Sequence, residues 1–184
     1  IAITTLLRVT LLLAHTATTT AALPAGDTDP PVQPFNSTLT VRDHNHWECT
    51  NYRNTADQSS AKSPIWQDCI TLRHNIHNGG RWTFSSGTQT RLAWYHTCAI
   101  GVDTAPNQWA GTLTKVGNID LIKIVEMTEQ MILKKNDPNQ VFVDKKDGIR
   151  KVRWDARVGS KGEMDCYQWV LYNDLFKVVW GLYY

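Results

Sequence analysis

The sequence lacks the motifs that mark most enzymes and cofactor-binding proteins. It contains no GxGxxG, P-loop, GxSxG or HExxH motif, so nothing indicates a bound nucleotide, a serine nucleophile or a zinc protease site. It also has no CxxC pair and no Cys/His spacing typical of zinc. We therefore expect no cofactor, no metal site and no catalytic residues, and we predict a protein that is not an enzyme.

An excess of charge of one sign is also missing. Lysine and arginine number 19 against 17 aspartates and glutamates. A chain with this balance has no general attraction to nucleic acid, so we expect no nucleic-acid partner. The apolar run near the start is shorter than the roughly 20 residues that a membrane-spanning helix needs, and we expect no stable membrane insertion.

The first residues combine Arg8, the apolar run VTLLLA and a tail of small residues. This order is typical of a secretory signal peptide, which we predict over residues 1–22; a disordered Thr/Ala-rich terminus is the alternative. Prolines in the next stretch predict an extended linker over residues 23–40, followed by a single domain over residues 41–184. The predicted location is therefore extracellular, and the sequon at Asn36 is a candidate glycosylation site.

Four cysteines in an exported chain favour two disulfides over a metal site or a catalytic thiol. Ser63 and Pro64 predict the start of a helix, and Cys69 lies on its apolar face. Cys98 falls on the apolar face of a predicted strand, the return strand of a hairpin that turns at Ser85–Gly87. Facing apolar surfaces favour the pair Cys69–Cys98, which leaves Cys49–Cys166; the other two pairings remain open.

Periodicity in the rest of the chain predicts one more helix and several strands. Asn118 can cap a helix over residues 119–136 that Asp137 and Pro138 end. A first strand is predicted within residues 39–51, a polar loop over 52–62, and strands from Gln140 onward with a hairpin turn at residues 159–162. The predicted fold class is α+β: a two-layer sandwich with an antiparallel sheet and two helices packed on one face, held by disulfides.

The ordered motifs of the central region resemble a known family. A cysteine is followed by SPIWQDC, GGRW, a segment ending in TCAIGV, and VGNIDLIKIV, all between residues 47 and 133. This combination resembles the secreted fungal effector domain of the necrosis-inducing factor family, and a late cysteine, Cys166, also fits. The resemblance implies a fold similar to that of virally encoded killer toxins, and it carries over no catalytic residues, only the cysteines. A long insertion around residues 136–147 departs from the family pattern.

His44, His46 and Glu48 form the one cluster of titratable residues that could carry chemistry. They alternate along a predicted strand and so share a face. One interpretation makes Glu48 a general base and a histidine a general acid, as in a secreted ribonuclease, and another makes the three a metal site. An exposed polar strand edge explains the pattern equally well, and we favour that interpretation.

Three other features have both a structural and a functional interpretation. His96 is predicted on an inward strand face, as a hydrogen-bonded core histidine. The basic segment 145–154 could contact an acidic glycan, a lipid headgroup or RNA, but a solvated strand face is favoured. The aromatic end with Trp169, Trp180, Tyr183 and Tyr184 is interpreted as strand packing, with a partner-binding surface as the alternative.

Taken together, these features predict a secreted effector or toxin-like protein that binds a host or competitor protein or cell-surface target and can induce cell death. We expect a monomer whose loops 50–62 and 103–117 supply specificity. A small secreted hydrolase such as a ribonuclease is the first alternative. A killer-toxin-like antifungal that acts on a membrane channel is the second.

Overall fold

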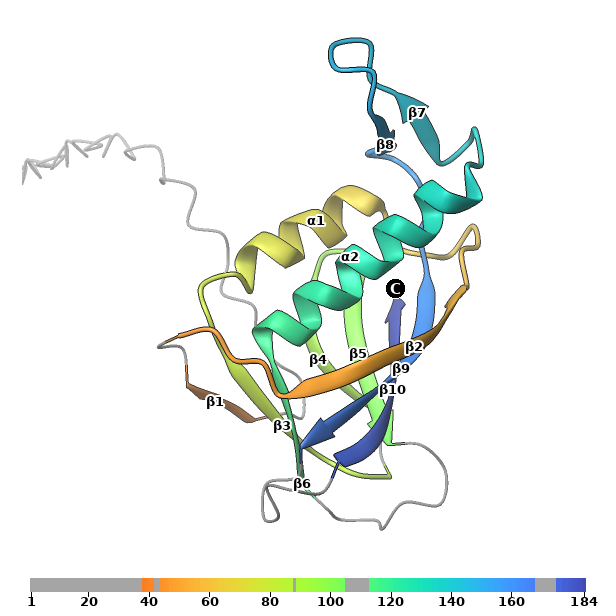
Figure 1. Ribbon diagram of the computed structural model, residues 1–184. Helices are drawn as coiled ribbons and strands as arrows, with labels where there is room; N and C mark the ends of the chain where they lie inside the picture. The colour runs from red at the N-terminus through yellow and green to blue at the C-terminus, as the bar shows by residue number, and fades with distance from the viewer. Residues whose placement is uncertain (1–37, 42–43, 88, 105–112, 168–174) are drawn as a thin grey trace, which may run out of the picture.

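The computed structural model describes residues 38–41, 44–87, 89–104, 113–167 and 175–184 (Figure 1). The predicted signal peptide, the sequon at Asn36 and Trp169 lie outside these residues. The helices are α1 (Trp66–Asn75) and α2 (Asn118–Lys135). The strands are β1 (Thr38–Val41), β2 (Cys49–Asp57), β3 (Arg81–Ser85), β4 (Thr90–Tyr95), β5 (Cys98–Thr104), β6 (Leu113–Gly117), β7 (Val141–Val143), β8 (Arg150–Val152), β9 (Ser160–Tyr167) and β10 (Leu175–Tyr183).

The main sheet has five antiparallel strands in the order β2-β9-β10-β5-β4, which confirms the predicted α+β fold with an antiparallel sheet. Two smaller sheets, β1-β3-β6 and β7-β8, were not expected as separate units. Helix α1 contacts β4 and β5, α2 contacts β2, and the helices contact each other (Figure 1). That both helices cover one face of the main sheet stays a prediction. Within the described residues, no helix is long and apolar enough to cross a membrane.

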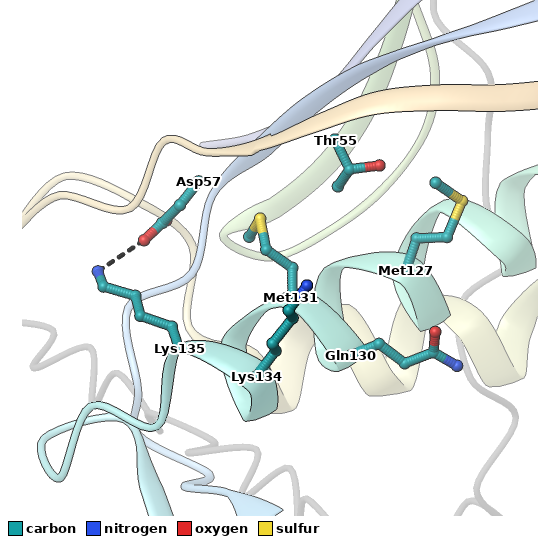
Figure 2. Close-up of a pocket in the computed structure, with 7 residues that line it drawn as sticks. All are labelled: Thr55, Asp57, Met127, Gln130, Met131, Lys134 and Lys135. Atoms are coloured by element: carbon teal, nitrogen blue, oxygen red, sulfur yellow. Dashed lines mark hydrogen bonds and ion pairs between the residues drawn. The ribbon is translucent and has the colours of Figure 1, made fainter.

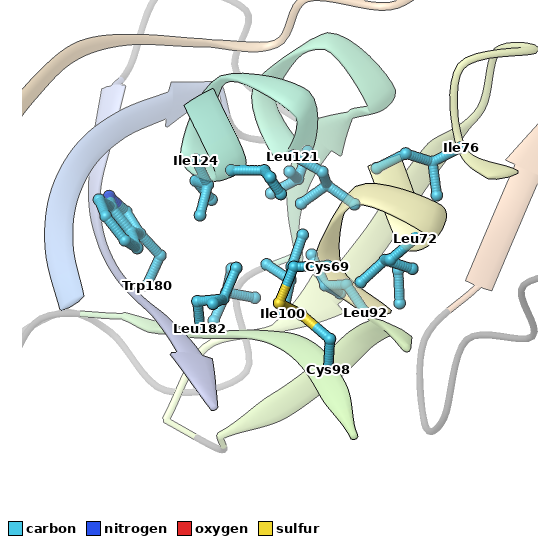
Figure 3. Close-up of a cluster of buried hydrophobic side chains, with 14 of the residues drawn as sticks. Cys69, Leu72, Ile76, Leu92, Cys98, Ile100, Leu121, Ile124, Trp180 and Leu182 are labelled. Carbon is cyan, nitrogen blue, oxygen red and sulfur yellow. A yellow bond between two sulfur atoms is a disulfide. The ribbon is translucent and has the colours of Figure 1, made fainter. Parts of the chain in front are cut away.

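The hydrophobic core is formed by side chains of both helices and of the main sheet (Figure 3). Side chains from α1, α2, β4, β5 and β10 meet there, and each loses almost all contact with solvent. Those drawn and labelled in the figure are Cys69, Leu72, Ile76, Leu92, Cys98, Ile100, Leu121, Ile124, Trp180 and Leu182. Burial of such side chains contributes roughly 1.5–3 kcal/mol each, so this cluster is the main source of stability.

Two disulfides, Cys69–Cys98 and Cys49–Cys166, connect these elements. The first joins α1 to β5 inside the core, as the facing-surface argument favoured (Figure 3). The second joins directly opposed residues of β2 and β9. The N–H of Tyr167 donates to the carbonyl of Glu48, and because bonded and non-bonded pairs alternate, the two cysteines form a non-bonded pair with closely spaced side chains.

Helix α1 begins two residues later than predicted. Ile65, not Ser63, is the N-cap, and it provides no side-chain capping bond. The hydroxyl of Ser63 instead accepts the N–H of Ser60 at 2.8 Å, so it belongs to the preceding turn. Cys69, Leu72 and Ile76 are buried as the periodicity predicted, and the helix also buries Trp66.

The predicted strand through Cys98 is in fact a tight hairpin, β4–β5, with His96 and Thr97 at its turn. His96 has a φ of 46° and is exposed, so the prediction of a core histidine was wrong. The hydroxyl of Thr97 is hydrogen-bonded to Oδ2 of Asp68 at 2.5 Å, which fixes the turn against α1. Neither residue is a strong turn former, so the alternating pattern hid the turn.

Residues 159–162 do not form the predicted hairpin turn either, because β9 begins at Ser160 and pairs with both β2 and β10. Gly162 is needed for packing: a Cβ there would overlap the ring of Trp180, its partner on β10. The glycine at position 162 therefore allows β9 and the Trp180 ring of β10 to lie close together within the sheet, and it does not mark a turn.

The predicted polar loop 52–62 also contains a strand, since β2 continues to Asp57. Ion pairs stabilise this strand on its neighbour: both Nη atoms of Arg53 lie 2.8 Å from the carboxylate of Asp165, and Arg53 Nε lies 3.5 Å from Glu163 Oε2. Lys177 on β10 extends the network to Glu163 at 3.0 Å. Of the predicted specificity loops, 50–57, 103–104 and 113–117 are strand, and 105–112 lies outside the described residues.

Candidate functional site

The predicted polar cluster lies on residues 44–49, which we call the strap because they cross the start of α2. The backbone N–H of His46 donates to the Oδ1 of Asn118 at 2.8 Å, and the carbonyl of His46 accepts the N–H of Ile119 at 3.2 Å. Asn118 was predicted as the helix cap, but it is the first residue of α2 and uses its side chain to hold the strap. The strap is thus part of the N-terminal end of the helix.

Two glycines allow the strap to approach this closely. A Cβ on Gly117 would overlap the carbonyl of His46, and one on Gly79 would lie 2.6 Å from the carbonyl oxygen of His44. Gly79 also has a φ of 98°, which other residues rarely adopt. Gly79 belongs to the GGRW motif and Gly117 to the VGN motif. Both motifs therefore contain a residue that allows the strap to pack closely against the protein.

Asp120, which the sequence reasoning did not single out, is the centre of this contact. Its carboxylate accepts the backbone N–H groups of Gly117 at 2.7 Å, Glu48 at 2.9 Å and Cys49 at 3.2 Å. The hydroxyl of Tyr52 is a fourth donor, at 2.6 Å. The side chain is fully buried, so it connects the helix start, the strap and β2 inside the protein.

Burial raises the pKa of Asp120 to about 6, although its four donors favour the ionised form. Burial and the neighbouring Asp120 carboxylate also raise the pKa of Tyr52 well above its ordinary value, so that its hydroxyl stays protonated as a donor. A carboxylate whose oxygens are all engaged by structural donors is not available to a substrate. We therefore assign Asp120 a structural role. The sequence feature that could have identified Asp120 is its position as the third residue of a helix. A carboxylate at this position can accept the backbone N–H of the N-cap residue.

The side chains of the predicted cluster do come together, with Arg81 from β3 as an addition. Oε1 of Glu48 lies 3.7 Å from Nδ1 of His46 and 3.5 Å from Nη1 of Arg81. The ring centroids of His44 and His46 are 4.3 Å apart. A general base, an imidazole and a guanidinium are the groups that phosphodiester cleavage uses. However, the Glu48 side chain is only 14% exposed, so a substrate would have limited access to it.

The metal interpretation of this cluster gains no support. Among the residues that the structure describes, no group of three histidines, cysteines, aspartates or glutamates is arranged to hold a metal ion. Arg81, which brings a positive charge to Glu48, would oppose a cation at this place.

A groove between β2 and α2 is a hollow of ligand-sized volume among the described residues (Figure 2). Its volume is about 650 Å³, within the range typical of ligand sites. Met127 and Met131 extend from α2 toward Thr55 on β2, and all three are half-buried. The floor is therefore apolar and flexible, since methionine side chains can adjust their shape to a bound surface.

One end of the groove is charged (Figure 2). Nζ of Lys135 donates to Oδ2 of Asp57 at 2.7 Å. Burial raises the pKa of Asp57, but hydrogen bonds from Lys135 and Ser59 outweigh this and hold the pKa below its usual value, so the pair is ionised at neutral pH. Lys134, next to it, is exposed and makes no ion pair with a described residue. The groove therefore combines an apolar floor with one available cation.

The aromatic C-terminal end is divided between core and surface. Trp180 is buried in the core, as its interpretation as strand packing predicted, whereas Tyr184 is exposed. The basic segment 145–154 lies elsewhere, mostly on the β7–β8 hairpin beyond the C-terminal end of α2 (Figure 1). Neither feature contributes a residue to the groove.

Comparison with known families identifies one match. The model of the Hce2 family, described as "pathogen effector; putative necrosis-inducing factor", matches residues 48–166. This range is about two thirds of the chain and contains all four cysteines, α1, α2 and the groove. No curated protein matches the sequence.

Proposed function

The chain belongs to the Hce2 family of pathogen effectors, and from this premise we propose that it acts outside the cell by binding a protein of the host through the β2–α2 groove. Binding at this groove triggers the necrosis that the description of the family mentions. The observation that carries the proposal is the groove itself, with its two methionines, its one available lysine and a volume of about 650 Å³.

The scaffold supports a role outside the cell. All four cysteines are paired, and disulfides persist in oxidising compartments such as the extracellular space. Both elements that line the groove are fixed to the core: β2 by the disulfide to β9, and α2 by Asp120 and its apolar face. A preorganised surface of this kind loses little entropy when it binds.

The groove favours a peptide segment that combines an apolar and an acidic side chain. An apolar side chain of the target would lie between Met127 and Met131, where it excludes water from both. A carboxylate next to it would pair with Lys134, whose charge is not used by a described residue. The ion pair Lys135–Asp57 forms the end of the groove on this side.

The test is the dose of purified protein that causes cell death in host tissue. Met127→Ser/Met131→Ser should raise the half-maximal dose at least ten-fold, because one large apolar contact contributes roughly 1.5–3 kcal/mol to binding. Lys134→Glu should raise it a few-fold, because an exposed ion pair contributes roughly 0–1 kcal/mol. Lys62→Glu, an exposed change of the same charge outside the groove, is the matched control and should leave the dose unchanged. Circular dichroism and thermal unfolding verify that each variant is folded. Full activity of both groove variants would contradict the proposal.

A second function, hydrolysis of RNA, is favoured by one observation: Arg81 lies beside Glu48 and His46. In this mechanism Glu48 removes the proton of the ribose hydroxyl, a histidine protonates the leaving oxygen, and Arg81 stabilises charge on the phosphate. Incubation of the purified protein with RNA and with polysaccharides tests it. Turnover that disappears in Glu48→Gln would establish this function, and an inert wild-type protein would exclude it.

A further inference from the structure

We infer that the β7–β8 hairpin is a docking arm for an anionic lipid surface, independent of the groove. The arm comprises residues 141–152, and it extends away from the rest of the protein beyond the end of α2 (Figure 1). Its base is anchored, because Val141 and Val152 face each other and are both buried. Residues 145–150, at its outer end, are all exposed.

The end of the arm exposes aliphatic side chains. Val143 and Ile149, which flank the turn, are each 58% exposed. Val143 is paired with Arg150 across the hairpin, so these two share a face, and Ile149 lies in the turn, next to Arg150. Apolar groups are therefore exposed on both sides of the turn, at the end of the projection. A lipid interface surrounds whatever enters it and so can cover both.

Positive charge is concentrated at the same place. Residues 144–151 contain four basic and two acidic side chains, for a net charge of +2, and the whole chain has a net charge of only +2. Lys151 is paired with both acids, Asp144 at 2.6 Å and Asp147 at 2.8 Å. The remaining cations, Lys145, Lys146 and Arg150, are exposed and form no ion pair with a described residue.

This combination fits the chemistry of a membrane surface. Long basic side chains keep their charges at the phosphate level while their stems and neighbouring apolar groups enter the region below. Each lysine or arginine near an anionic leaflet contributes about five-fold in affinity, and aliphatic groups add to it. RNA fits less well, because binding to single strands relies on aromatic stacking and a groove, whereas this tip presents valine and isoleucine.

The experiment is co-sedimentation of the purified full chain with vesicles. One set contains phosphatidylcholine alone, and the other contains phosphatidylcholine with roughly a third phosphatidylserine. We expect binding to the anionic set only, weakened as salt is raised because surface charges are screened. Equal binding to both sets, or none to either, would overturn the inference, as would binding to RNA in the absence of binding to vesicles.

Variants of the arm distinguish the contribution of its charges to vesicle binding from that of its apolar side chains. Lys145→Glu/Lys146→Glu should reduce the partition coefficient roughly thirty-fold or more, from about five-fold for each lysine. Val143→Ser/Ile149→Ser should reduce it roughly ten-fold without changing net charge. Lys62→Glu/Lys161→Glu makes the same charge change at exposed positions outside the arm and is the control. An equal loss in the control would show non-specific attraction and overturn the assignment to the arm. Folding is verified by the unfolding midpoint, which these exposed changes should not move.

Discussion

The strap and the arm both carry titratable side chains, but the strap is bonded to the start of α2 and the arm projects beyond the end of that helix. The strap, residues 44–49, carries the histidines and the glutamate that suggested chemistry, yet its backbone is bonded to Asn118 and Asp120 and its carbonyls lie against two glycines. The arm, residues 141–152, carries lysines and aliphatic residues that suggested an ordinary solvated strand, yet it projects from the protein with apolar groups exposed. The comparison teaches that the residues of the strap that suggested chemistry are part of the architecture, while the exposed, less conspicuous surface of the arm is suited to recognition.

The largest expected effect comes from the disulfide that ends the strap. Cys49→Ser/Cys166→Ser should lower the free energy of unfolding by about 5 kcal/mol, because the bond spans 117 residues of the unfolded chain. Cys69→Ser/Cys98→Ser, which spans 29 residues, should cost about 3.5 kcal/mol. Urea unfolding of both variants gives the two values. The reverse order would show that loop entropy does not govern these bonds.

Loss of Asp120 is the next effect in size. Asp120→Ala leaves four donors inside the protein without their acceptor and should cost about 4 kcal/mol, since each buried unsatisfied group costs roughly 1–3 kcal/mol. Asp147→Ala, on the arm, is the control and should leave the free energy of unfolding nearly unchanged, as most exposed substitutions do. Comparable losses in the two variants would remove the distinction between strap and arm.

Asp120 also predicts a pH dependence. Its pKa in the folded protein, about 6, lies above the ordinary value of 3.8, so the folded state binds the proton more tightly than the unfolded state. The stabilisation is complete below pH about 4 and is lost as the pH rises through about 6, for a total of about 3 kcal/mol. Denaturant unfolding between pH 4 and 7 measures it: the wild-type free energy should fall relative to that of Asp120→Asn, and parallel curves would contradict the assignment.

The smallest expected effect on stability belongs to the arm. Val143→Ser/Ile149→Ser should change the free energy of unfolding by less than about 0.5 kcal/mol, because both side chains are already largely in water. The thermal midpoint is the measurement. A clear destabilisation would mean that these side chains are packed, and the arm would then be part of the core.

Part of this architecture could be predicted from the sequence and part could not. Helix α2 and the pair Cys69–Cys98 followed from apolar periodicity, because Leu121, Val125 and Ile132 repeat at helical spacing and are buried. The second half of β2 was missed because its stability comes from ion pairs with β9, which lies about a hundred residues away in the chain. The left-handed residues Asn51 and Asn54 also interrupt its alternation.

The candidate site was harder to predict for the same reason. His46 and Glu48 were visible as a cluster, but Arg81 and Asp120 reach them only through tertiary contacts. The groove combines Thr55, from a stretch interpreted as a loop, with Met127 and Met131, which periodicity assigned to the apolar side of the helix. A surface made by two distant elements leaves no local pattern, because neither element is unusual by itself.

The most direct test of the central claim, that the strap is structural and activity lies on the exposed surfaces, is the cell-death dose response of Glu48→Gln. The substitution keeps the shape of the side chain and removes its charge, and the backbone bonds of the strap remain. Measured beside wild type, well below both unfolding midpoints, Glu48→Gln should give the same half-maximal dose. A loss of activity in this folded variant would contradict the claim and make the polar cluster the active site.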